Sequence, residues 1–450
     1  RDLRMSRGLG DVYKRQMKIV SDINAFVYIV LTIFYCYQGI YVIIALLGKK
    51  KKKNYNTEAK TLHKYAFIIA ARNENAVIGN LIDSIKNQNY PSELIDVIVV
   101  ADNCTDNTAE ISRQHGAIVY ERFNNILIGK GYAMDYVFNK ICEERGDYTC
   151  YDGYFVFDAD NIIDVNYVRE MNKVFDSGYK VVTSYRNSKN YDTNWITAGY
   201  SLWFIREAKY LNNPRMMIKT SCAVSGTGYL VDSSIIKKNH GWKCNLLTED
   251  IEFTVTNILD GEKVGYCEDA MFYDEQPTTF KQSWNQRMRW TKGFYQVLFK
   301  YGRDLFRTMF KEKRMFVSCY DMIMTLAPAT LFTLGTILLN VIILLCGGLN
   351  PTLFKQIAGP TVQAILLGFF NFYMMLLVIG LITLITEWKK ILAPARKKIM
   401  YLFSFPLFIA TYIPISIVAL FKKVEWKPIP HTVVTVSYTH LRAHETCADL

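Results

Sequence analysis

Short apolar runs alternate with amphipathic segments through residues 65–184. Runs at residues 65–71, 95–101, 117–120, 154–157 and 180–184 have the length and composition of buried strands. Between them, residues 76–87, 107–115, 131–144 and 165–176 show the apolar spacing of helices. Strands that alternate with helices predict βαβ units, so we expect an α/β domain with a mainly parallel sheet.

Longer apolar segments lie near both ends of the chain. Residues 23–47 carry no charged side chain, and a helix of roughly 20 apolar residues suffices to cross a bilayer. Further apolar blocks occupy residues 315–346, 362–386 and 400–421. The stretch between residues 279 and 314 has apolar residues at helical intervals among Lys, Arg and Trp, which is typical of interfacial helices. We therefore expect a multi-pass membrane protein.

The net charge of +12 comes largely from basic clusters beside these apolar blocks, at residues 49–53, 311–314, 389–398 and 422–423. This placement follows the positive-inside rule, so it predicts a lipid bilayer rather than nucleic acid as the partner. The five lysines at 49–53 place the central domain in the cytoplasm. The ten cysteines form no CxxC pair, which argues against a disulfide framework or zinc site and fits that compartment.

The side of the C-terminus stays open. Three spans after residue 315 would place it outside, whereas Lys422, Lys423 and Lys427 favour the inside. Either the fourth block, which contains Pro406 and Pro414, or another block would then be a re-entrant hairpin.

These patterns predict six segments. Residues 1–16 precede Met17 and read as a non-native leader, residues 17–48 as a transmembrane helix, and residues 54–277 as the catalytic domain. Residues 278–314 form amphipathic interfacial helices, residues 315–421 a transmembrane region, and residues 422–450 a tail whose last part, from 436, also reads as non-native.

Polar residues follow the ends of three predicted strands. Arg72 and Glu74 follow the first strand, Asp102 the second, and Asp158 and Asp160 the fourth. In parallel sheets ligands bind beyond the carboxyl ends of the strands. We expect these side chains to converge on one edge of the sheet.

The paired carboxylates Asp158 and Asp160 suit a hard divalent cation that neutralises a departing diphosphate. Alternatively, Asp160 caps the helix that begins near residue 162. Asp102 can accept hydrogen bonds from a nucleobase or ribose, or belong to a turn. Lys130 lies between two glycines at a helix entrance, which favours a phosphate site or a simple turn.

Two later motifs add a base and cations. Glu249 and Asp250 open a helix, where Asp250 could take a proton from a sugar hydroxyl or both acids could stabilise the helix dipole. Arg287 and Arg289 could contact phosphates, and Trp290 offers an apolar face to a sugar. The alternative is a membrane anchor, since Arg and Trp are common at membrane interfaces.

In order and spacing, these motifs resemble the membrane-integrated branch of glycosyltransferase family 2, which includes cellulose, chitin, hyaluronan and poly-N-acetylglucosamine synthases. The similarity covers about residues 66–290 and rests on six motifs. They are Ala-Arg-Asn-Glu (71–74), Ala-Asp-Asn-Cys-Thr-Asp (101–106), Gly-Lys-Gly-Tyr-Ala (129–133), Asp-Ala-Asp (158–160), Thr-Glu-Asp (248–250) and Gln-Arg-Met-Arg-Trp (286–290). Residues 225–228 and 426–432 also resemble relatives, the former as an acceptor-side loop or a plain glycine-rich turn.

The resemblance implies a GT-A fold, which is Rossmann-like, and an inverting transfer from a UDP-sugar. It implies UDP contacts by Asp102 and Lys130, contacts with Mg²⁺ or Mn²⁺ and the diphosphate by Asp158 and Asp160, and a base at Asp250. Around the acceptor and diphosphate it implies Gln286, Arg289 and Trp290. Further substrate-binding candidates are Arg72, Glu74, Glu249 and Arg287.

The expected function is extension of a β-linked polysaccharide at the cytoplasmic face of the plasma membrane, on a glycan or lipid-linked acceptor. The alternative is a single-sugar transferase acting on a lipid or envelope glycan, because the spans are few for a polymer channel. A transporter with a nucleotide-sensing domain is disfavoured, because the spans carry almost no ionisable residue beyond Asp321. Spacing determines neither the donor sugar, the linkage nor the oligomeric state.

Overall fold

The computed structural model describes residues 2–48, 58–327, 335, 338–342, 345, 351–424 and 431. The predictions for the basic cluster at 49–53, for residues 426–430, and for the tail from 432 onward lie outside the described residues.

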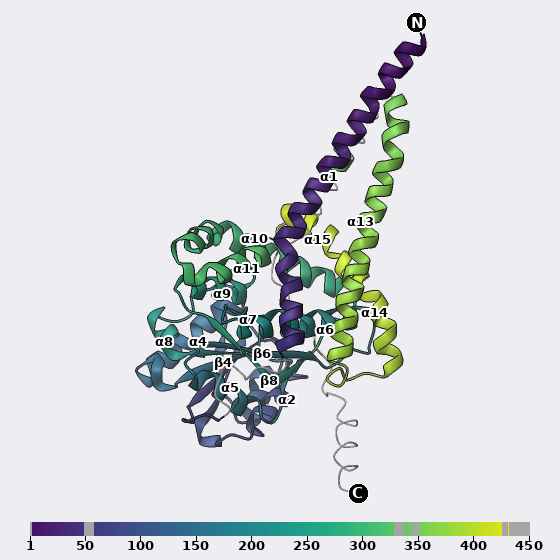
Figure 1. The fold of residues 1–450 in the computed structure, drawn as a ribbon. Helices are drawn as coiled ribbons and strands as arrows, with labels where there is room; N and C mark the ends of the chain where they lie inside the picture. The colour runs from purple at the N-terminus through teal and green to yellow at the C-terminus, as the bar shows by residue number, and fades with distance from the viewer. Residues whose placement is uncertain are drawn as a thin grey trace.

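The central domain is built on one eight-stranded sheet with the order β3-β2-β1-β4-β7-β6-β8-β5. Figure 1 shows strands β4, β6 and β8 of this sheet among the helices of the domain. Strand β1 is parallel to β2 and β4, β2 to β3, and β6 to β8, whereas β7 runs antiparallel to β4 and β6, and β5 to β8. The predicted α/β class with a mainly parallel sheet is confirmed. The strands are β1 (Tyr65–Ala71), β2 (Ile95–Asp102), β3 (Ile118–Arg122), β4 (Gly153–Asp158), β5 (Ile162–Ile163), β6 (Val181–Ser188), β7 (Tyr229–Asp232) and β8 (Val264–Asp274).

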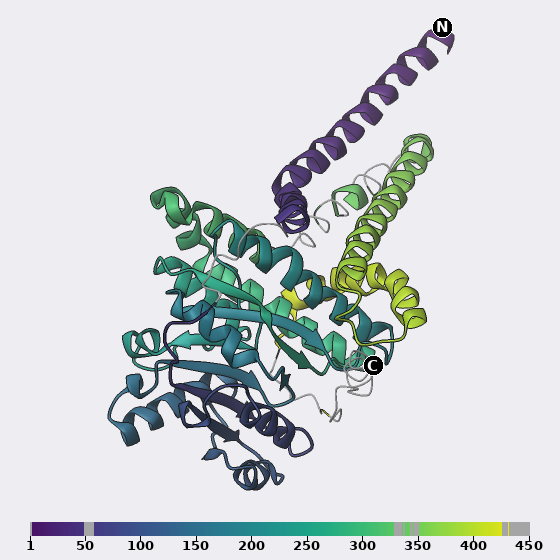
Figure 2. The same cartoon turned by 60° about the horizontal axis from the view of Figure 1, so that its bottom comes forward.

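Helices cover both faces of this sheet, as the alternating pattern predicts (Figures 1 and 2). The apolar residues of the first helix, Ile78, Leu81, Ile82 and Ile85, are all buried, which is why this short segment is helical. The helices of the domain are α2 (Ile78–Lys86), α3 (Thr108–Gln114), α4 (Lys130–Arg145), α5 (Tyr167–Asp176), α6 (Trp195–Glu207), α7 (Asn213–Met217), α8 (Ser233–Lys238) and α9 (Glu249–Leu259).

The predicted interfacial stretch is one long helix, α10 (Phe280–Lys311), followed by α11 (Phe316–Leu326). Thr279 caps its start, since the Thr279 hydroxyl accepts from the Gln282 amide at 3.3 Å and the Gln282 side chain reaches back to Thr279. Helix α10 packs against α9, α11 and α15 (Tyr412–Phe421). It therefore lies between the sheet domain and the apolar helices.

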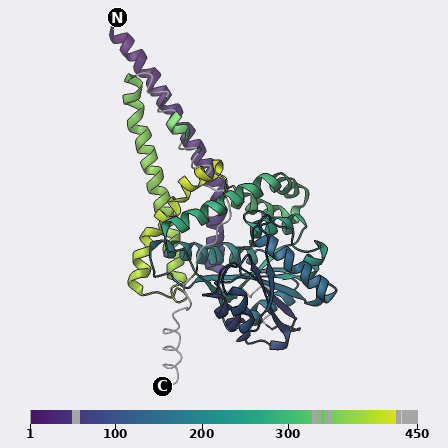
Figure 3. The same cartoon turned by 180° about the vertical axis from the view of Figure 1, so that it is seen from behind.

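The long helices α1 (Asp2–Leu47) and α13 (Pro351–Thr386) project from the same side of the domain (Figures 1 and 3). Two segments are long and apolar enough to cross a membrane, Thr361–Thr386 and Ala395–Phe421, and the second comprises α14 (Ala395–Ala410) and α15 (Tyr412–Phe421). A third is the pair Ser21–Val27 and Thr32–Leu47, if this pair, bent by 41°, is one span. These coincide with three of the four predicted apolar blocks. Much of the remaining predicted block, residues 315–346, lies outside the described residues.

A buried ion pair fixes α1 to the domain. Arg215 donates to both carboxylate oxygens of Asp321, at 2.7 and 2.8 Å, and Tyr41 of α1 donates to the same carboxylate at 2.9 Å. Both charged side chains are buried. Asp321, the one acidic residue of its predicted apolar block, is therefore paired with a cation, as buried charges must be.

Candidate active site

Eleven of the twelve candidate side chains line one cavity of about 520 Å³. It lies beyond the carboxyl ends of β1, β2 and β4, where the register places Ala71 opposite Ala101 and Ala70 opposite Asp158. The structure thus brings together segments that are far apart in the chain. The eleven residues are Arg72, Glu74, Asp102, Lys130, Asp158, Asp160, Glu249, Asp250, Gln286, Arg289 and Trp290.

At the β2 end of the cavity, Asp102 is held by Arg122. Its carboxylate accepts from Arg122 Nη1 at 2.5 Å, and both side chains are buried. Burial raises the pKa of Asp102, although the guanidinium opposes the shift. Arg122 Nη2 also donates to the Leu127 carbonyl at 2.7 Å, so the pair anchors the loop that precedes Lys130. The result is a fixed hydrogen-bond acceptor at this end of the cavity.

Lys130 connects the end of β4 to the 225–228 loop. Its ammonium donates to Asp158 Oδ1 and to the Gly226 carbonyl, the latter at 2.8 Å. Asp160 lies deeper, where the Glu275 amide donates to it at 3.1 Å. Burial alone would raise the pKa of Asp160, but the nearby positive charges of His431 and Lys189 lower it. Asp160 is therefore an ionised carboxylate inside the cavity.

Asp158 and Asp160 offer a donor set for a divalent cation. Within the described part of the chain, no three His, Cys, Asp or Glu side chains form a complete metal site. Mg²⁺ commonly takes one or two carboxylates and completes its shell with substrate phosphates and water, and carboxylates also suit Mn²⁺. The residues present therefore fit a cation that binds together with a diphosphate.

Glu249 is buried and Asp250 is half-buried, and the two follow one another in the first turn of α9. Burial and the neighbouring charge of Asp250 raise the pKa of Glu249 to about 7, and burial also raises the pKa of Asp250. The pair therefore takes up a proton at mildly acidic pH, whereas isolated carboxylates ionise near pH 4. Such a pair can accept a proton from a substrate at neutral pH.

Helix α10 brings the last motif to this carboxylate pair. A Cβ atom at Gly293 would lie 2.5 Å from the Thr248 side chain, so only glycine lets α10 pack this closely on the start of α9. Arg289 Nη1 donates to the Leu247 carbonyl at 3.2 Å. Gln286 Oε1 is buried and has no hydrogen-bond partner among the described residues. An unpaired buried oxygen in a cavity wall is suited to accept a hydrogen bond from a ligand.

Trp290 belongs to an aromatic wall of the cavity. Its ring packs edge-on against Tyr200 and Phe204, with centroids 5.8 and 6.0 Å away. Because these neighbours fix its orientation, Trp290 offers a rigid apolar surface to a ligand.

Arg287, the twelfth candidate, does not line the cavity. Its side chain is fully buried, and Nη1 donates to the Phe408 carbonyl at 3.0 Å and to the Thr411 hydroxyl at 2.6 Å. The guanidinium lies 4.3 Å from the centre of the Phe408 ring. Arg287 therefore holds the junction between α14 and α15, and the structure places it away from the other candidates.

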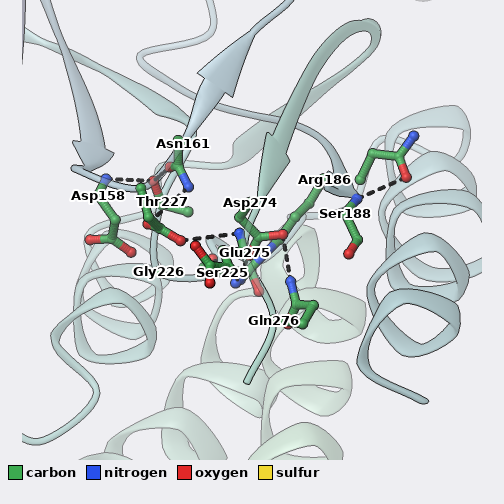
Figure 4. A network of polar contacts seen from close by, with 12 residues as sticks. Asp158, Asn161, Arg186, Ser188, Ser225, Gly226, Thr227, Asp274, Glu275 and Gln276 are labelled. Atoms are coloured by element: carbon green, nitrogen blue, oxygen red, sulfur yellow. Dashed lines mark hydrogen bonds and ion pairs between the residues drawn. The ribbon is translucent and has the colours of Figure 1, made fainter. Parts of the chain in front are cut away.

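Arg186 and Asp274 line the cavity but belong to none of the predicted motifs (Figure 4). Arg186 Nε donates to Asp274 Oδ2 at 2.7 Å, and Arg186 Nη1 donates to the Ser225 carbonyl at 3.0 Å. Burial raises the pKa of Asp274 to about 6, with Arg186 opposing the shift. The sequence held only a weak signal for each residue: Arg186 is the one charged residue of β6, and Asp274 is the last residue of β8.

Thr227 connects the 225–228 loop to the aspartates (Figure 4). Its hydroxyl accepts from the Asp158 amide at 2.9 Å and donates to Asn161 Oδ1 at 2.5 Å. The loop that resembles an acceptor-side element therefore packs directly on the end of β4.

His431, from the C-terminal stretch that resembles relatives, also lines the cavity. Its Nδ1 lies 3.0 Å from Glu74 Oε2, and its Nε2 lies 3.9 Å from Asp160 Oδ2. Burial alone would lower the pKa of His431, but the carboxylates of Asp160 and Glu74 raise it to about 10. The imidazolium therefore offsets part of the negative charge around Asp160.

Comparison with known proteins gives a consistent result. The family model described as "Glycosyltransferase like family 2" matches residues 63–293, just over half of the 450 residues. A probable glycosyltransferase of Bacillus subtilis, YdaM, is 27% identical over 305 residues, covering 63% of this chain and 66% of YdaM. These matches confirm the resemblance that the motifs indicate, and the sheet described above has the mainly parallel, Rossmann-like arrangement that GT-A implies.

Two further relatives are named for different products. The β-monoglucosyldiacylglycerol synthase of Synechocystis is 28% identical over 242 residues, covering 52% of this chain and 49% of that protein. The poly-β-1,6-N-acetyl-D-glucosamine synthase of Staphylococcus aureus is 24% identical over 289 residues, covering 61% of this chain and 64% of that protein. The chain thus spans about half to two thirds of the length of the curated relatives it matches.

Proposed function

Because the chain belongs to glycosyltransferase-like family 2, we propose that it is an inverting enzyme that moves a sugar from a UDP-sugar to an acceptor hydroxyl at the membrane. We propose that the acceptor is a growing β-linked polysaccharide, and that the catalytic domain lies at the cytoplasmic face of the plasma membrane. The observation that carries the proposal is the convergence of six separated motifs on one cavity, which is lined by both carboxylates and cations.

In this proposal Asp250 is the general base. The acceptor oxygen attacks the anomeric carbon of the donor sugar while its proton passes to Asp250. The bond from the anomeric carbon to the diphosphate oxygen breaks, and UDP leaves with the electron pair. Attack on the face opposite the leaving group inverts the anomeric configuration. The raised pKa of Asp250 and of its neighbour Glu249 favours this role, because their carboxylates bind protons more readily than exposed ones do.

Two cations of the cavity would bind the diphosphate. Lys130 and Arg289 line the cavity and are suited to hold phosphate oxygens. Asp158 and Asp160 would hold Mg²⁺ or Mn²⁺, which neutralises charge on the departing UDP when bound. Asp102 would accept a hydrogen bond from the nucleoside, and Arg72 and Glu74 would flank the same end of the cavity. Trp290 and Gln286 would bind the acceptor.

A second candidate is a single-sugar transferase acting on a lipid, which the similarity to a monoglucosyldiacylglycerol synthase favours. Both functions use the same cavity and differ in the acceptor and in product length.

The test is UDP release by membranes that contain the full chain, over a panel of UDP-sugars with Mg²⁺ or Mn²⁺, with products separated by size. Long product from one donor is the expected result. A product that carries one added sugar would replace the polysaccharide proposal with the lipid or envelope-glycan one. Folded protein that releases UDP from no donor in the panel would contradict the use of UDP-sugars.

A further inference from the structure

An open space separates Asp250 from Arg186, and Gly226 forms its floor. A Cβ atom on Gly226 would lie 3.9 Å from Asp250 Oδ2 and 4.0 Å from Arg186 Nη1. Gly226 has φ +77°, a conformation that glycine adopts without strain. The space between the proposed base and the guanidinium therefore stays open because residue 226 has no side chain.

Arg186 is fixed in place on its other sides. Its Nε and Nη2 donate to Asp274, and its Nη1 donates to the Ser225 carbonyl (Figure 4). Its guanidinium lies 3.6 Å from the centre of the Phe204 ring. A guanidinium carries five N–H groups, and these contacts with described residues use three. A rigid, cavity-lining side chain thus has two donors for a ligand.

The partner of Arg186 decides which ligand it suits. Asp274 is 3% exposed, and its other oxygen accepts a hydrogen bond from Gln276 at 2.5 Å. A ligand therefore cannot displace Asp274 from Arg186. By contrast Asp158, the partner of Lys130, is 42% exposed, so a cation can reach its carboxylate. Once Asp158 binds a cation, the Lys130 ammonium can pair with a phosphate instead. The Arg186–Asp274 pair is neutral overall. It therefore suits the hydroxyl groups of a neutral sugar better than a diphosphate.

Arg186 lies on the same wall as Trp290, because Phe204 contacts both side chains. We propose that Arg186 is a specificity residue that donates hydrogen bonds to a hydroxyl group of the acceptor saccharide, whose terminal ring lies over Gly226 between Arg186 and Asp250. This inference rests on the proposed function and deepens it, since it makes the acceptor a sugar rather than a lipid alcohol.

The test is calorimetric titration of the full chain in detergent with β-linked trisaccharides of N-acetylglucosamine and of glucose, and separately with UDP. Wild type is expected to bind one of the trisaccharides. Arg186→Lys keeps the positive charge but replaces the planar guanidinium with a single ammonium group. The trisaccharide affinity of this variant should therefore fall at least about tenfold, as expected for a lost bidentate contact. Its UDP affinity should stay within about twofold. Unchanged trisaccharide binding by this variant, or no binding of either trisaccharide by wild type, would overturn the inference.

A second variant distinguishes a steric block of the proposed sugar position from a folding defect. Gly226→Ala places a methyl group in the proposed ring position, whereas Gly261→Ala is matched in backbone strain, with φ +80° and open space around its Cβ. Trisaccharide affinity should fall in Gly226→Ala and not in Gly261→Ala, at equal unfolding temperatures. Equal affinities in both variants would overturn the inference. Trisaccharide binding that depends on Arg186 in a protein that releases no UDP would keep this site and refute the proposed transfer.

Discussion

Replacing Asp250 with asparagine is predicted to abolish sugar transfer and leave the donor site intact. Asn has almost the same shape as Asp, but its amide cannot take a proton from the acceptor at neutral pH. A positioned general base contributes about 10²–10⁴-fold to a rate. Transfer should therefore slow by that factor, which corresponds to about 3–5 kcal/mol in the activation barrier.

The structure also predicts the effect of Asp250→Asn on UDP binding. Lys130 and Arg289 both interact electrostatically with Asp250. Loss of this negative charge leaves the two cations less neutralised, so they attract a diphosphate at least as strongly as before. UDP affinity should thus be unchanged or higher in the variant, in contrast to its rate.

The assay is the initial rate of UDP release at saturating donor, with UDP affinity measured by titration on the same preparation. Asp260→Asn is the matched control, because Asp260 lies just beyond the other end of α9 and pairs at the surface with Lys238 at 2.8 Å. This control should transfer sugar at the wild-type rate. Turnover by Asp250→Asn within tenfold of wild type would refute the role of base. Parallel loss of UDP affinity would make Asp250 a donor-binding residue instead.

Four further substitutions test the other parts of the site and its support. Wild-type transfer should rise with pH through about 7, because the Glu249–Asp250 pair is protonated below that pH and ionised above it. Glu249→Gln removes the negative charge beside Asp250, so the midpoint of the pH profile of kcat/KM should move to lower pH. An unchanged midpoint would contradict the electrostatic coupling between the two carboxylates. Asp160→Ala should lose transfer together with its stimulation by Mn²⁺ after chelation, and Mn²⁺-stimulated UDP release by this variant would refute the metal assignment. Arg287→Met should lower the free energy of unfolding by about 1.5–3 kcal/mol, the usual contribution of hydrogen bonds to a charged group. Arg289→Met should instead lower the rate of UDP release at an unchanged unfolding midpoint. The reverse pattern in denaturation and UDP-release measurements would contradict the contacts described for both arginines.

Much of the sheet could be predicted because its strands are encoded locally. Strands β1, β2, β3, β4 and β6 each contain a short apolar run, and each predicted segment overlaps the observed one. Strand β7 has only four residues after a glycine-rich loop, and Glu268 and Asp269 interrupt the apolar pattern of β8. Both strands exist because tertiary pairing with β4 and β6 outweighs weak local signals.

The site could be located because strand ends carry positional information. Parallel neighbours bring their carboxyl ends to one edge, so polar residues after β1, β2 and β4 had to lie close together. Arg186 escaped this reasoning because it lies within β6 and reaches the cavity through its long side chain. Asp274 escaped it because β8 was not predicted. Neither residue could be placed without knowing which strands are neighbours on the far side of β4.

Helical geometry explains why the two arginines of the last motif point to different places. Residues three, four and seven positions apart share a face of a helix, so Gln286 lies on the same face of α10 as Arg289, Trp290 and Gly293. Gly293 contacts the start of α9, which turns this face toward the cavity. Arg287 is about 100° further round the helix than Gln286, and its side chain meets α14 and α15 instead. Helix α10 presents one arginine to the cavity and another to the apolar helices α14 and α15, so it couples the cavity to these helices. Arg287, Arg289 and Trp290 belong to one turn of α10. Movement of the α14–α15 junction, which Arg287 contacts, should therefore displace Arg289 and Trp290 together.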